Sequence, residues 1–132
     1  MGDISVASWW PMIYTSAQSH AMYVAQLCPG PFGELILEES RGFCNQGAPT
    51  SESELQLRQA QSMTLISKIS SIAHAASMAH THPNVATEIL AATRDFCKRV
   101  PLAYNACNES IALTANISSI CHRGWARVSG QG

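Results

Sequence analysis

Small and apolar residues recur at steps of three and four along the first part of the chain. They are Ile13, Ala17, His20 with Ala21, Val24 and Leu27. This spacing is typical of one face of an α-helix, whose successive turns bring residues three or four positions apart onto the same side. Ser8 is a suitable N-cap residue, and the two prolines and the glycine of residues 28–31 cannot continue a helical hydrogen-bond ladder. We therefore predict a helix that begins near Ser8 and ends at residue 28.

The clearest pattern covers residues 51–80. Its apolar stripe consists of Leu55, Ser62, Leu65 with Ile66, Ile69, Ile72 with Ala73, Ala76 and His80. Ser51 and Glu54 have the spacing of a capping box, in which two side chains bond the backbone N–H groups at the start of a helix. Glu52 and Glu54 also fall in the first turn, where the helix dipole favours negative charge. We predict a long central helix over residues 51–80, which Pro83 ends.

A third stripe begins at Val85 and continues through Ile89, Ala92, Phe96, Val100, Ala103, Cys107 and Ile111. A second apolar face follows Pro101 and consists of Leu102, Ala106, Leu113, Ile117 and Ile120. Either one long helix is kinked at Pro101, or two helices meet there. We expect the Pro-kinked C-terminal helix, because the stripe keeps its phase across the proline. We expect it to stop at Gly124, since glycine is common just past the end of a helix.

Residues 32–50 show the weakest pattern. The segment GELILEESRG could form a short helix or a strand, and NQGAPT has the composition of a loop. A chain of 132 residues is long enough to bury a core within a single domain. We predict an all-α fold, a compact bundle of four to five helices formed by residues 1–132, with the helix over residues 51–80 at its centre.

Charge is scarce and unevenly distributed. Charged residues make up 13% of the chain, about half the share of an average soluble domain. Residues 1–57 contain six acidic residues and one basic residue, whereas residues 58–132 contain seven basic and three acidic ones. We expect the acidic and basic elements to pack side by side; the alternative is a partner with a complementary surface. We predict neither nucleic-acid binding, which needs a basic surface, nor a membrane span, which needs about 20 apolar residues.

Three histidines and a methionine, His74, Met78, His80 and His82, occur within nine positions. At about 100° per residue, His74 and His80 lie about 120° apart around a helix, so they cannot share one metal ion. His74 and Met78 are one turn apart and could bind a soft cation such as Cu(I), but no further ligand occurs at a fixed spacing. We predict no metal site and interpret these four residues as packing and helix-end residues.

The five cysteines, Cys28, Cys44, Cys97, Cys107 and Cys121, form no Cys-x-x-Cys pair. A zinc ribbon or a thioredoxin-type redox site is therefore not indicated. Buried reduced thiols are typical of intracellular proteins, so we expect a cytoplasmic protein. Two glycosylation sequons, at residues 108–110 and 116–118, keep a secreted protein as the alternative. In that case a Cys28–Cys44 bridge would be the easiest disulfide to form.

The stretch SSICHRGW contains Cys121 followed by His122. It resembles the covalent haem motif Cys-x-x-Cys-His, with Ser118 in place of the first cysteine, so that one thioether bond could form. On the C-terminal helix of an all-α chain, this pair is similar to that of the cytochrome c′ bundles. The resemblance implies a small haem-binding bundle. The alternative function is therefore a small cofactor-binding bundle, which holds either haem at Cys121 and His122 or a soft metal ion at His74 and Met78.

No catalytic motif such as GxSxG, HExxH or a glycine-rich phosphate loop occurs in the chain, so we predict that it is not an enzyme and has no cofactor. The aromatic stretch SWWPMIY, residues 8–14, is either part of the core or an anchor for a partner. A bundle with so few charges leaves small and apolar residues exposed, and such surfaces usually mark an interface. The predicted function is a non-enzymatic protein-interaction module that binds a partner helix or self-associates as an oligomer.

Overall fold

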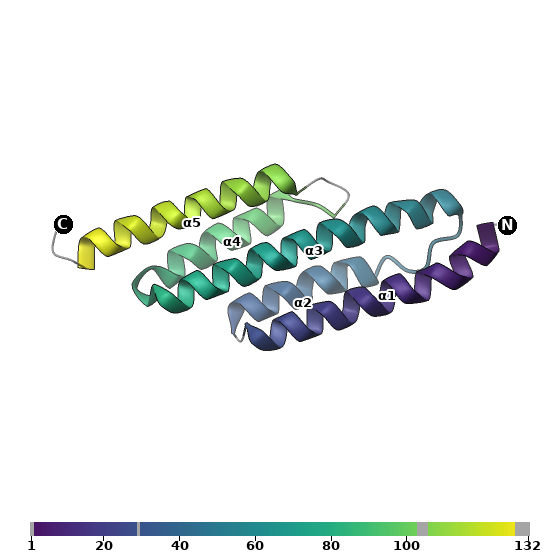
Figure 1. Cartoon of the computed structure of the whole chain (residues 1–132), viewed down its shortest axis with the longest axis horizontal. Coiled ribbons are helices and arrows are strands. Elements are labelled where there is room, and N and C mark those ends of the chain that lie inside the picture. Colours follow the sequence, from purple (N-terminus) through teal and green to yellow (C-terminus); the bar gives the residue numbers. More distant parts are fainter. Residues whose placement is uncertain (1, 29, 103–105, 129–132) are drawn as a thin grey trace.

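Five α-helices make up the computed structural model, which describes residues 2–28, 30–102 and 106–128, with side chains from residue 8 to residue 126 within these ranges. The helices are α1 (Gly2–Leu27), α2 (Pro31–Cys44), α3 (Glu52–Thr81), α4 (Ala86–Arg99) and α5 (Cys107–Val128). A single 3-10 turn, η1 (Pro83–Val85), precedes α4, and no strand occurs in the described ranges. The all-α fold with four to five helices is therefore confirmed (Figure 1).

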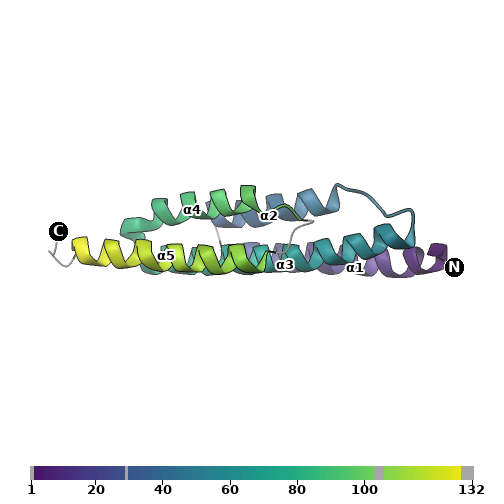
Figure 2. The same cartoon turned by 90° about the horizontal axis from the view of Figure 1, so that it is seen from above.

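The helices are arranged in two layers. α1, α3 and α5 lie side by side in one layer, and α2 and α4 form the second layer against them (Figure 2). The α1–α2 hairpin packs on one side of α3, the α4–α5 hairpin packs on the other, and α2 also contacts α4. The long helix is therefore at the centre of the bundle, as predicted.

A continuous apolar core fills the space between the two layers and receives residues from all five helices. Its fully buried large side chains include Ile36, Phe43, Leu65, Ile69, Ile72, Ile89, Phe96 and Ile117. Burial of one such side chain contributes about 1.5–3 kcal/mol relative to leaving it in water. α1 contributes the small residues Ala17 and Ala21, so this helix can lie close to its neighbours.

The start of α1 differs from the prediction. The helix begins at Gly2 rather than near Ser8, and it continues through Pro11. Pro11 lies on the exposed side, where water can bond the carbonyl group that a proline inside a helix leaves without a donor. The expected stripe is buried or half-buried from Ile13 to Val24, but Leu27 is 65% exposed.

The ambiguous segment after residue 31 forms a helix, α2. Pro31 occupies its first turn, where a missing N–H costs nothing because that group would have no helical partner. Phe32, Leu35, Ile36 and Phe43 are buried at helical spacing on the face toward the core. Residues 46–50 connect α2 to α3 without helix or strand, as the loop composition predicts.

The N-terminus of α3 has the predicted cap. Ser51 is the N-cap residue, and its side chain accepts a hydrogen bond of 3.2 Å from the backbone N–H of Glu54. The reciprocal bond differs by one residue from the standard box, because the Glu54 carboxylate accepts from the backbone N–H of Thr50 at 2.7 Å. The first bond satisfies a donor that a helix start would otherwise leave open, and the second ties the residue before the cap to the first turn.

The buried face of α3 is rotated slightly from the predicted stripe. Leu55, Leu65, Ile69 and Ile72 are buried as expected, and the remaining buried residues are Gln61, Lys68, Ala75 and Ala79. The expected stripe members Ile66 and His80 are exposed. Because α3 packs against helices in both layers, its buried arc is wide and includes polar side chains that a count of apolar residues does not select.

The prediction of one helix kinked at Pro101 is wrong. α4 ends at Arg99 and α5 begins at Cys107. Val100 has an extended backbone, φ −115° and ψ 91°, which is the conformation that a following proline imposes. The second apolar face lies on α5, where Leu113, Ile117 and Ile120 are buried, whereas Cys107 and Ile111 of the first stripe are exposed. Ala103 lies outside the described residues.

Gly124 does not stop α5, which continues to Val128. It is buried where α5 crosses the η1 turn, and a Cβ atom at this position would collide with Cγ1 of Val85. The side chain of Asn84 also donates a hydrogen bond of 3.2 Å to the Gly124 carbonyl group. Glycine is needed here for close packing between elements rather than for a helix end.

Candidate functional site

The exposed apolar side chains are concentrated on one layer of the bundle. Every large hydrophobic residue that is exposed within the described range lies on α1, α3 or α5: Trp9, Met12, Met22, Tyr23, Leu27, Leu57, Met63, Ile66, Ile111 and Trp125. Met63 at 70% and Tyr23 at 64% are among the most exposed. We call the solvent-facing side of α1, α3 and α5 the three-helix face.

Charge has the opposite distribution. Of the seventeen charged residues, four lie on α2 and five on α4, although each of these helices has only 14 residues. On α1, no Asp, Glu, Lys or Arg occurs after Asp3, and on α3 the only one between residues 59 and 81 is the buried Lys68. The three-helix face is therefore apolar and weakly charged, and the α2–α4 layer is charged.

A groove runs between α1 and α3 beside the α1–α2 turn. It has a volume of about 700 Å³ and is lined mainly by apolar residues, which include Val24, Leu27, Phe32, Ala73 and Ala76. The alanines of α3 keep the groove open because they have no side-chain atoms beyond Cβ. A groove of this kind can receive an apolar side chain of a partner helix.

The two tryptophans of the aromatic stretch at residues 8–14 differ in burial, so one belongs to the packed interior and the other is open to a partner. Trp10 is half-buried, and its ring packs against Tyr14 at 5.7 Å and against Phe43 of α2 at 5.8 Å between centroids. Trp9 is 51% exposed. Trp10 is therefore a packing residue that joins α1 to α2, whereas Trp9 is accessible to a partner.

The residues considered for a metal or haem site are not brought together. His74 and His80 are exposed on α3, and Met78 and His82 are half-buried near its end. The ring of His82 bonds the Met78 carbonyl group at 3.1 Å, which makes it part of the helix end. In the described ranges no three His, Cys, Asp or Glu side chains are placed to hold a metal ion.

Cys121 and His122 lie on different sides of α5. The Cys121 thiol is buried in the core, and burial raises its pKa. His122 is exposed, and its ring stacks on Trp125 with 6.4 Å between centroids. A porphyrin could not meet both side chains without displacing part of the core.

The five cysteines are all thiols in the structure. The Cys97 thiol is the most strongly perturbed, because burial and the nearby Glu39 carboxylate raise its pKa to about 12, with Lys68 acting in the opposite sense. Burial also raises the pKa of Cys28. A raised pKa keeps a thiol protonated at neutral pH, whereas a nucleophilic cysteine needs a lowered one.

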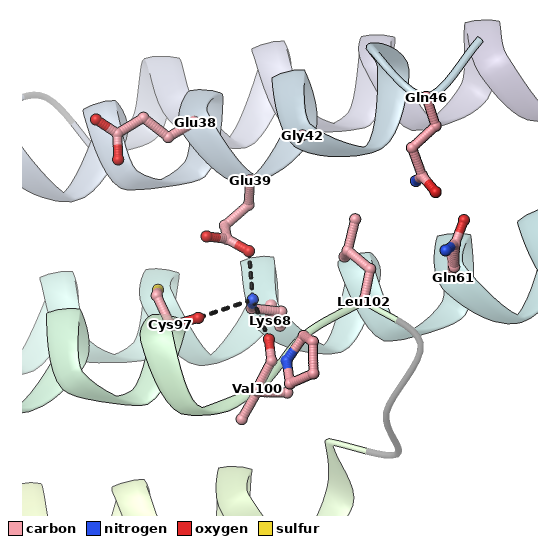
Figure 3. A pocket seen from close by; sticks show the side chains of 10 residues that line it. Glu38, Glu39, Gly42, Gln46, Gln61, Lys68, Cys97, Val100 and Leu102 are labelled. Carbon is pink, nitrogen blue, oxygen red and sulfur yellow. Dashed lines mark hydrogen bonds and ion pairs between the residues drawn. The ribbon is translucent and has the colours of Figure 1, made fainter.

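A polar cluster around Lys68 is not among the sites that the sequence predicts. This side chain is 2% exposed, forms an ion pair with Glu39 of α2, and donates hydrogen bonds to the carbonyl groups of Cys97 and Val100 (Figure 3). In an unbroken helix the N–H of residue 101 would bond the Cys97 carbonyl group, but Pro101 has no N–H. The Lys68 ammonium group supplies the missing donor and connects α3 to α2 and to the end of α4.

A signal for this cluster was present in the sequence. Lys68 is three residues from Leu65 and four from Ile72, so it occupies an apolar register of the helix, and it precedes the buried Ile69. Its partner cannot be found in this way, because Glu39 lies in the segment whose secondary structure was ambiguous. The pair joins the acidic first half of the chain to the basic second half, in line with the expected packing.

Comparisons with protein-family models, with curated proteins and with solved structures found no match to this chain. Within the described residues, no helix combines the length and the apolar character that a membrane span requires.

Proposed function

We propose that this chain is a non-enzymatic protein-interaction module that binds a partner helix, or a second copy of itself, through the three-helix face. The observation that carries the proposal is the separation of surface types: the exposed large hydrophobic side chains lie on α1, α3 and α5, whereas α2 and α4 are rich in charge. Exposed apolar surface gathered on one side of a small protein usually marks an interaction site.

The face has features that suit helix docking. The small residues of α3 allow a partner backbone to approach closely, and the groove between α1 and α3 can receive an apolar side chain. Trp9 and Tyr23 offer large contact area at low cost in conformational entropy. α1, α3 and α5 together carry eight of the seventeen charged residues over a much greater length than α2 and α4, so like-charge repulsion between two copies is limited.

Sedimentation velocity over a wide concentration range tests the proposal, with Met63→Lys as the variant and Ala91→Lys as its control. Met63 is 70% exposed on α3, the central helix of its layer, and Ala91 is exposed on α4. We expect the Met63 variant to weaken association by about tenfold or more, because the new charge must lose its bound water in the interface. The Ala91 control should associate as strongly as the wild-type chain. Circular dichroism should be the same for all three proteins.

If the wild-type chain stays monomeric, helical peptides selected for binding to it serve as the partner in the same comparison. The proposal is wrong if neither self-association nor peptide binding distinguishes Met63→Lys from Ala91→Lys.

A further inference from the structure

A cleft with several polar residues lies where the second layer meets α3, on the buried side of that helix. It has a volume of about 440 Å³ and is bounded by the end of α2, by α3 and by the connection after α4. Gln61 of α3 lines it, is 6% exposed, and has a side-chain oxygen, Oε1, without a hydrogen-bond partner. A buried carbonyl oxygen without a donor is costly, so a donor group is expected to occupy the space beside it.

A second amide faces Gln61 across the cleft. Gln46, just after α2, points toward Gln61 in Figure 3. Its Nε2 donates to the backbone carbonyl group of Phe43 at 3.4 Å, and this bond leaves its Oε1 available. Two amide oxygens from different elements therefore converge on one space, and Leu102 lines the same cleft.

The lining residues favour a cation over an anion. Lys68 uses its three N–H groups on Glu39, Cys97 and Val100, so it has none left for an anionic ligand. The charged residues of the cleft are Glu38, Glu39 and Lys68. They sum to one negative charge. Glu38 and Glu39 also border a neighbouring hollow that Arg94 and Lys98 of α4 line, whereas Gln46 and Gln61 border the cleft alone.

We propose that this cleft binds the guanidinium group of a small organic cation, with the Oε1 atoms of Gln46 and Gln61 as its acceptors. A guanidinium group is planar, carries N–H donors along several directions, and can therefore bridge two oxygens. It is also less strongly hydrated than an ammonium group, which suits a cleft with the apolar walls of Pro101 and Leu102. The proposal is independent of the three-helix face.

Titration with methylguanidinium, followed by the side-chain amide signals of Gln46 and Gln61 in NMR spectra, tests the site. We expect saturable shifts with a dissociation constant on the order of 1 mM, which such a small fragment can reach. Methylurea has nearly the same shape without the charge and should bind at least about tenfold more weakly, because bonds to charged donors are stronger. Gln46→Leu, at an exposed position, should weaken binding without unfolding the chain.

Gln61→Leu should abolish binding, and Gln61→Glu should strengthen it because it adds a negative charge at the same place. Gln59→Leu, at an exposed position on α3 outside the cleft, should leave binding unchanged and serves as the matched control. The proposal is overturned if shifts do not saturate, if methylurea binds equally well, or if the Gln46 variant and the Gln59 control bind alike. A water molecule at Gln61 that methylguanidinium does not displace would also overturn it.

Discussion

Lys68 connects three helices through one ammonium group, and a double-mutant cycle with Glu39 measures how much this contributes to stability. Lys68 is 2% exposed and the Glu39 side chain 19% exposed, so the ion pair is largely shielded from water. Removal of one partner from a buried pair costs about 3–5 kcal/mol. Because water reaches Glu39 from one side and Lys68 keeps two carbonyl partners, we expect Glu39→Leu to cost about 2–3 kcal/mol.

Lys68→Met removes the ion pair and also leaves the carbonyl groups of Cys97 and Val100 without their donor. Each buried carbonyl group without a partner costs about 1–3 kcal/mol, and the bond to Cys97 is only partly buried, so we expect a total of about 3–4 kcal/mol. The double variant should cost about 3 kcal/mol, because the ion pair is absent from it and mainly the carbonyl groups are affected. The two single costs should therefore together exceed the double cost by about 2–4 kcal/mol.

Urea unfolding followed by circular dichroism at 222 nm and neutral pH gives these free energies. The control is the exposed pair Asp95–Arg99, whose side chains are 64% and 50% exposed and which should couple by less than about 0.5 kcal/mol. If the Glu39–Lys68 coupling is as small as that of the control pair, or if Lys68→Met leaves stability unchanged, the cluster does not hold the helices together.

Three further predictions concern other parts of the bundle. Gly124→Ala should lower the free energy of unfolding by about 1–3 kcal/mol, because the new Cβ atom collides with η1. Gly42→Ala should raise it by about 0.5–1 kcal/mol, because Gly42 is exposed in α2 and a Cβ atom there meets nothing within 4 Å. Urea unfolding that shows similar effects for both variants would contradict this contrast. Trp10→Ala should cost about 2 kcal/mol and lower the melting temperature, while Trp9→Ala should leave that temperature unchanged and weaken any association measured by sedimentation. The free energy of unfolding should fall as pH rises from 9.0 toward about 12, because the Cys97 thiol has the lower pKa in the unfolded chain and ionises there first. Cys97→Ala should make this fall smaller in denaturation curves measured across that pH range.

The helices that the sequence predicts best are those whose signals are local. The cap at Ser51, the acidic first turn and the stripe through Leu65 and Ile69 act within α3 itself, so they are legible without knowledge of its neighbours. Proline acts in the same way, and the end of α3 before Pro83 lies within one residue of the prediction. The fold class follows from these helices, since helical periodicity over most of the chain is compatible only with a helical bundle.

Other features depend on contacts between distant residues and needed the tertiary structure. The break at Pro101 is stabilised by Lys68, which comes from another helix, and the role of Gly124 depends on Val85. The separate roles of Trp9 and Trp10 depend on where α2 lies. The sequence alone determined that the chain is a charge-poor helical bundle, because helix formation and charge are properties of local composition. Only the tertiary structure decided which residues share a surface, because the three-helix face and the Gln61 cleft are assembled from helices far apart in the chain.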